Sequence, residues 1–299
     1  MAELYERFVA LYPYPHERIR HGAPRAELNR RYLEHLYEGK NKGITPIVVA
    51  LDSTLLGTIE NNVSMRTSTP VGEITADTIQ RYAVELLVAQ HEHLRQVGVE
   101  RAAHEAFRSL NETTYLNVYR HLMEHGELSE EDLNAPLDAE YPFELTAGVL
   151  NEKVKATDIE RASELLIVDM PVQVASDVFA YFPFGGWDVS PAPETMLAIA
   201  RYWLERDDAY PAVIAAEFIE FYTPVPVTTR RDAEILAVEH TMVSSAMPVR
   251  VYRGFDKLVE ALYGQHDWYL WWEQLPAAVV VETPQRRLNS TRGKSVRAG

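Results

Sequence analysis

The chain opens on apolar residues that recur with the spacing of a helix. Leu4, Phe8 and Leu11 share one face of a helix predicted over residues 2–12, and Pro13 would end it. The same spacing recurs along the rest of the sequence. It predicts further helices over residues 26–38, 77–94, 99–125, 194–206, 230–244 and 255–263.

Other apolar runs have the length and composition of strands. Residues 45–51 are almost entirely apolar, which is typical of a strand buried on both faces, and Asp52 and Ser53 can then cap a short helix. Residues 178–182 fit a strand, although a helix there stays open. Strands are also predicted over residues 164–168, 212–216, 218–223 and 268–273.

These elements together predict an α/β (α+β) fold. We expect a helix-rich N-terminal lobe with one or two strands over residues 1–170, because helices dominate that half. Residues 171–282 are expected to form an α/β domain with a mixed sheet flanked by helices. Residues 283–299 complete the chain as a basic tail, either a flexible terminus or an arm that grips an acidic partner or its own body.

Charge narrows the range of partners. The 299 residues carry 29 Lys and Arg against 44 Asp and Glu, a formal net charge of −15. Such a surface repels phosphate backbones and anionic lipid, so we expect a protein partner and neither nucleic acid nor membrane. No apolar run approaches the ~20 residues of a membrane span.

Missing residue types exclude whole classes of chemistry. The chain has no cysteine, so disulfides, thiolate metal sites and cysteine nucleophiles are excluded. Glycine-rich phosphate loops and the G-x-S-x-G elbow do not occur, and no cofactor is expected. The start of the chain has neither the basic segment nor the apolar segment of a signal peptide, so a cytoplasmic location is expected.

One string of residues has the spacing of a metal site. His121 and His125 lie four apart with Glu124 beside them, as in the H-x-x-E-H pattern of inverted zinc peptidases. On a helix both imidazoles could reach one zinc ion. A third ligand cannot be identified, however, and histidines near a helix C-terminus are stabilised there without metal. We therefore predict no metal, with His121 and His125 as the weak candidates.

All five tryptophans lie in the C-terminal part of the sequence. Alternation along residues 268–273 gives both faces of that strand an aromatic character, with Trp271 on one of them. Either the strand is buried on both faces, or some rings form a binding surface with Phe184 and Trp187. Trp187, Trp271 and Phe184 are the predicted binding residues under the second interpretation.

The order of several motifs resembles a known family. Residues 182–188 read Phe-Pro-Phe-Gly-Gly-Trp-Asp, residues 201–203 read Arg-Tyr-Trp, and residues 268–273 form an aromatic run that ends in an acid. In this order they resemble the bacterial domain-of-unknown-function family 4253 over residues 178–273. The resemblance implies no activity. Where that family often has Cys and Asp after a helical glutamate, this chain has Ser244 and Ala246.

Three functions fit these patterns. The first is a non-catalytic cytosolic binding protein, for instance an immunity protein, that holds a protein partner through an acidic, tryptophan-rich surface. The second is a hydrolase-type enzyme that would need its acid-base groups to converge in one cleft. The third is a subunit of a larger assembly. The acid-base candidates for the enzyme are Asp188, Glu239, His240 and Glu273.

Overall fold

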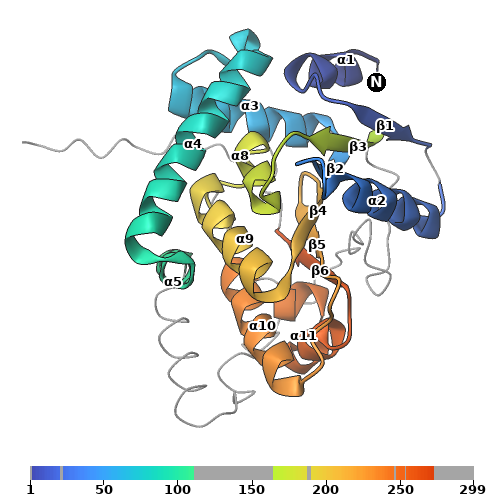
Figure 1. Ribbon diagram of the computed structural model, residues 1–299, viewed down its shortest axis with the longest axis vertical. Helices are drawn as coiled ribbons and strands as arrows, with labels where there is room; N and C mark the ends of the chain where they lie inside the picture. The colour runs from blue at the N-terminus through green and yellow to red at the C-terminus, as the bar shows by residue number, and fades with distance from the viewer. Residues whose placement is uncertain are drawn as a thin grey trace, which may run out of the picture.

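The computed structural model describes residues 2–20, 23–110, 164–186, 190–245, 247–252 and 254–272. Its centre is a six-stranded mixed sheet with the order β1-β3-β2-β4-β5-β6 (Figure 1). Only β2 and β4 pair in parallel, and the other neighbours are antiparallel. The strands are β1 (His16–Ile19), β2 (Thr45–Leu51), β3 (Glu164–Met170), β4 (Tyr210–Ile214), β5 (Phe218–Tyr222) and β6 (Asp267–Trp271).

Helices surround this sheet, and three of them begin at a side chain that accepts from a free backbone N–H group. Asp52 accepts a hydrogen bond from the Leu55 amide, and Thr75 and Thr229 cap later helices in the same way. The α-helices are α1 (Ala2–Leu11), α2 (Arg25–Gly39), α3 (Ser53–Thr67), α4 (Ala76–Val97), α5 (Val99–Leu110), α8 (Val178–Tyr181), α9 (Pro193–Asp207), α10 (Arg230–Val243) and α11 (Phe255–Leu262). Short helical turns are η1 (Val71–Glu73), η2 (Ala175–Asp177) and the π-helical η3 (Met247–Val251).

Opposite faces of the sheet are covered by α2 and α9. Neighbouring residues of a strand point to opposite faces, so the contacts of Phe221 and Tyr222 show which helix covers each face. The ring of Phe221 packs against Trp203 of α9, whereas Tyr222 packs against Tyr32 of α2. In Figure 1 the two helices lie on either side of β4 and β5. Burial on both faces explains why every residue of β2 is buried.

Several predicted elements are confirmed. The strand over residues 45–51 is β2 with the same bounds, and the strands around Glu217 are β4 and β5, which form an antiparallel hairpin. Residues 178–182, which fitted either a strand or a helix, contain the helix α8. The helix predicted over residues 99–125 is α5 as far as Leu110, and the rest of that prediction lies outside the described residues.

Strands on both sides of residue 170 belong to one sheet. β3 ends at Met170, and its neighbour β2 pairs with β4 from the later half of the chain. One connected set of buried side chains runs from Phe8 to Trp272. The two predicted lobes therefore share a core within the described residues. None of the described helices combines the length and the apolar character needed to cross a membrane.

Candidate functional site

Five of the predicted site residues lie outside the described part of the chain. These are Trp187, Asp188 and Glu273, together with the weak metal candidates His121 and His125. The structure places the remaining four, which are Glu239, His240, Phe184 and Trp271. Among the residues that the structure describes, no group of three or more His, Cys, Asp and Glu side chains could hold a metal ion.

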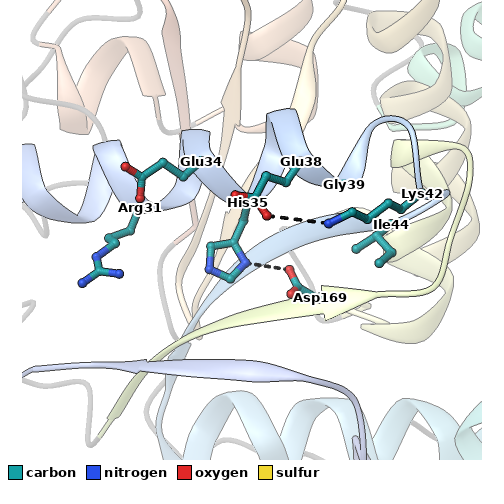
Figure 2. Close-up of a pocket in the computed structure, with 8 residues that line it drawn as sticks. All are labelled: Arg31, Glu34, His35, Glu38, Gly39, Lys42, Ile44 and Asp169. Carbon is teal, nitrogen blue, oxygen red and sulfur yellow. Dashed lines mark hydrogen bonds and ion pairs between the residues drawn. The ribbon is translucent and has the colours of Figure 1, made fainter.

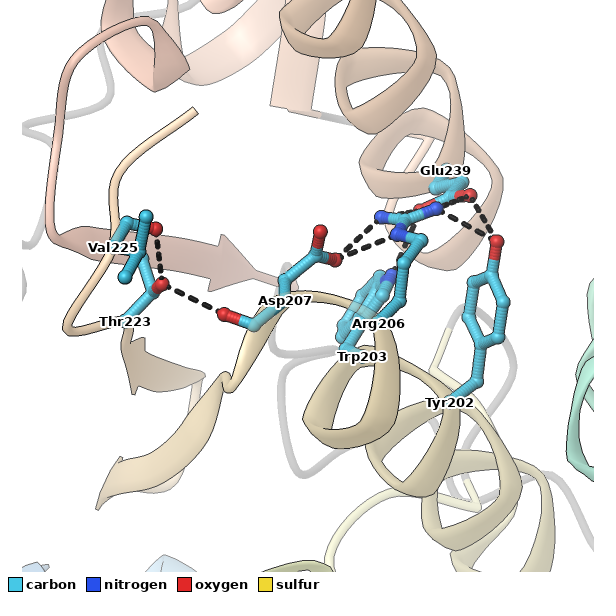
Figure 3. A network of polar contacts seen from close by, with 7 residues as sticks. All are labelled: Tyr202, Trp203, Arg206, Asp207, Thr223, Val225 and Glu239. Carbon is cyan, nitrogen blue, oxygen red and sulfur yellow. Dashed lines mark hydrogen bonds and ion pairs between the residues drawn. The ribbon is translucent and has the colours of Figure 1, made fainter. Parts of the chain in front are cut away.

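Glu239 is the acceptor at the centre of a buried polar network (Figure 3). Its side chain is fully buried, and both of its carboxylate oxygens accept from the guanidinium of Arg206, at 2.6 and 2.8 Å. Trp203 Nε1 donates to it at 2.8 Å and the Tyr202 hydroxyl at 3.3 Å. On its other edge the guanidinium donates to Asp207 at 2.7 Å. A carboxylate with these donors joins α10 to α9, and it is not positioned to exchange protons with a bound molecule.

His240, next to Glu239 on α10, is sealed inside the protein. It is fully buried, and neither ring nitrogen has a hydrogen-bond partner among the residues that the structure describes. Its ring lies 5.2 Å from that of Trp203 and 5.6 Å from that of Trp268. Burial, followed by the charge of Arg206, lowers the pKa of His240 to about 3. The imidazole is therefore neutral at ordinary pH and has no route to a substrate in this conformation.

The aromatic residues predicted to bind a ligand fill the core instead. Trp271 is 6% exposed and Phe184 is 2% exposed, and the Phe184 ring packs 5.3 Å from that of Trp272. Trp203, Trp268 and Trp272 are buried as well. The four described tryptophans are therefore core residues, as in the alternative of a strand buried on both faces. A surface built on Trp271 and Phe184 lacks the exposure that contact with a partner requires.

A cavity lies elsewhere, between α2, the turn that follows it and β3 (Figure 2). Its volume is about 230 Å³. The lining is largely charged, and it consists of Arg31, Glu34, His35, Glu38, Gly39, Lys42, Ile44 and Asp169. A space of this size admits a small polar molecule or several waters.

His35 joins α2 to two strands at the wall of this cavity. Its Nδ1 lies 2.8 Å from Oδ1 of Asp169 on β3, and its Nε2 lies 3.2 Å from Oε2 of Glu17 on β1. Ionised carboxylates only accept hydrogen bonds, so both contacts form together only when the ring carries both protons. Burial acts to lower the pKa of His35, but the hydrogen bonds with Asp169 and Glu17 outweigh it and the pKa is raised. The charged ring is therefore the form that fits.

The charges around the cavity largely pair with one another. Arg31 lies 3.2 Å from Glu17, and Lys42 lies 3.7 Å from Glu38. Because both nitrogens of His35 face carboxylates, neither is available to take a proton from a bound molecule. The arrangement therefore stabilises the edge of the sheet, and it is not a general-base site in this form.

Sequence reasoning missed this cluster because it missed β1. The strand reads His-Glu-Arg-Ile, a charged stretch with no apolar alternation, and its pairing with β3 involves residues far along the chain. Short charged strands are common at sheet edges, where they prevent pairing with other chains. The signal in the sequence that could have indicated this cluster was the spacing of Arg31 and His35, which lie one helical turn apart and so share a face of α2.

The His35 contacts predict a dependence of stability on pH. Because the pKa is raised above 6.5 in the folded state, the stabilisation is complete below about pH 6.5 and is lost as the pH rises through the folded value. We expect His35→Gln to lower the free energy of unfolding by roughly 1 kcal/mol at pH 6, and by less at pH 9. Urea unfolding of both proteins across this range measures it. A constant difference between the two proteins would contradict the assignment.

Comparison with known proteins extends over the later half of the chain. Residues 166–273 match the family described as Domain of unknown function (DUF4253). The match spans β3 to β6 and so includes Glu239, His240 and the buried tryptophans of the core. No curated protein and no solved structure matches the chain.

Proposed function

We propose that this protein is a non-catalytic binding protein that holds a basic protein partner on an acidic surface. The observation that carries the proposal is the formal net charge of −15, from 44 acidic and 29 basic residues. A charge excess of this size favours and accelerates the approach of a cationic partner, and it opposes anionic ones. An immunity protein that neutralises a basic toxin is one concrete form, on analogy alone.

The positions of the acid-base candidates support binding over catalysis. Glu239 is held by Arg206, Trp203 and Tyr202, and the ring of the buried His240 has no hydrogen-bond partner within the described part of the chain. Converging acid-base groups in an accessible cleft would favour an enzyme, and these two do not provide them. The cavity beside His35 is bounded mainly by groups that already pair with each other.

Purification from the native host, with this protein as bait, tests the proposal. We expect one stoichiometric partner with a basic contact surface, and a complex that dissociates as salt rises from about 0.05 to about 0.5 M, because screening weakens attraction between exposed charges. Light scattering on the reconstituted complex then gives its stoichiometry. Recovery of no stoichiometric partner, or of a complex whose affinity does not change with salt, would overturn the proposal.

A further inference from the structure

Exposed apolar side chains lie on three segments, which are the last turn of α2, the loop after β5 and the loop after α11. Tyr37 is 59% exposed, Val225 is 67% exposed and Tyr263 is 48% exposed. A single exposed apolar side chain is common on protein surfaces, whereas a contiguous group of them marks an interaction site. We call this group the tyrosine surface. It consists of Tyr37, Tyr222, Val225, Tyr263 and His266.

Contacts join the side chains of Tyr37, Tyr222 and His266. Tyr37 and Tyr222 share a side-chain hydrogen bond, and the Tyr222 ring stacks on that of His266 at 6.1 Å. The two loops that carry the other members are hydrogen-bonded to each other. The Thr223 amide donates to the His266 carbonyl at 2.7 Å, and the Gly264 amide donates to the Val227 carbonyl at 2.8 Å. The surface therefore rests on a fixed backbone, which limits the entropy lost on binding.

The chemistry of the surface suits cationic groups. Tyrosine rings attract guanidinium and ammonium groups to their faces, and this chain already uses that contact internally. Arg18 lies 4.3 Å from the centre of the Tyr5 ring, and Lys40 lies 5.7 Å from the centre of the Tyr210 ring beside the tyrosine surface. Tyrosine is also enriched at the energetic centres of protein interfaces.

Acidic side chains lie at the rim of the tyrosine surface. Asp267 lies close enough to interact electrostatically with the Tyr222 hydroxyl, and Asp208 interacts in the same way with the ammonium group of the neighbouring Lys40. Burial, the contact with Tyr37 and the charge of Asp267 raise the pKa of Tyr222 to about 12, so its hydroxyl stays protonated and able to donate. A second copy of this chain is a poor occupant because each copy carries a net charge of −15.

We infer that the basic partner docks on the tyrosine surface, with arginine side chains stacked on the rings of Tyr37 and Tyr263. The inference rests on the proposed function and specifies where on the molecule it takes place. The exposed valines of α4, Val84 and Val88, provide the comparison, because they are 47% and 64% exposed and belong to a surface without these tyrosines.

The test uses the full chain and two probes, a short arginine-rich peptide with a photo-crosslinking group and a glutamate-rich peptide of equal length. We expect the basic peptide alone to bind and to crosslink to the tyrosine surface. Tyr37→Ala with Tyr263→Ala should weaken its binding by about 10- to 100-fold, as the loss of two interface tyrosines does. Val84→Ser with Val88→Ser should leave the affinity unchanged. Thermal unfolding confirms that both variants fold, since all four side chains are exposed.

The outcomes separate this inference from the proposed function. Crosslinks confined to another acidic region, or equal affinities for the two double variants, would overturn the tyrosine surface and leave the binding function standing. Failure of the basic peptide to bind at any salt concentration would count against both. Equal binding of the two peptides would show that charge does not select the partner, and would also overturn both.

Discussion

Replacing Arg206 by alanine is expected to lower the free energy of unfolding by about 3 kcal/mol or more. The change leaves the carboxylate of Glu239, which is fully buried, without the guanidinium that pairs with both of its oxygens. Water cannot take over that role in the core, so most of the cost is that of an uncompensated buried charge. Urea unfolding followed by circular dichroism measures the change.

Two further variants identify the physical origin of that loss. Arg201→Ala removes another arginine of α9, whose pairing with Glu205 one turn away is partly exposed, and should cost about 0.5 kcal/mol. Adding Glu239→Gln to Arg206→Ala removes the buried charge while keeping an oxygen to accept from Trp203 Nε1. This double variant should be more stable than Arg206→Ala alone. If it is less stable, the buried charge is not the cause.

Gly185→Ala is expected to be comparably destabilising, by about 3 kcal/mol. Gly185 has a φ of +86°, a conformation that costs an L-residue about 1–2 kcal/mol. An added Cβ would also lie 2.1 Å from the carbonyl oxygen of Pro191, which already accepts from the Gly186 amide. The Gly185 carbonyl in turn accepts from Asn62 of α3 at 2.9 Å, so the backbone has little freedom to move away.

Gly57 provides the matched control for this prediction. It lies inside α3 with no heavy atom within 4 Å of an added Cβ, so Gly57→Ala should raise the free energy of unfolding by about 0.5–1 kcal/mol. The same methyl group is therefore expected to have opposite effects at the two positions. Similar unfolding midpoints for both variants would show that the turn at Gly185 can relax.

Local sequence patterns predicted most of the regular elements. The apolar run of β2 and the cap Asp52 were found without any tertiary information, because their signals lie within a few residues. The charged strand β1 gave no such signal, since its conformation depends on pairing with β3. The helix α8 was left ambiguous because four apolar residues fit either conformation.

The candidate site depended far more on tertiary contacts. The sequence offered Glu239 and His240 as acid-base groups and Trp271 as a binding residue, because it shows residue type without showing exposure. The packing of α9 against α10 pairs the carboxylate of Glu239 with Arg206. The packing around β6 buries Trp271, and neither result can be seen in the sequence. The tyrosine surface could not be predicted, since its members come from separate parts of the chain.

By itself, the sequence determined the net charge, the absence of cysteine chemistry, the α/β class and the positions of most helices and strands. These properties follow from composition or from repeats of two to four residues, which each segment carries alone. The tertiary structure decided which polar groups pair and which rings meet solvent. Contacts such as Arg206 with Glu239, 33 residues apart, and His35 with Asp169, 134 apart, form only when the sheet brings distant segments together.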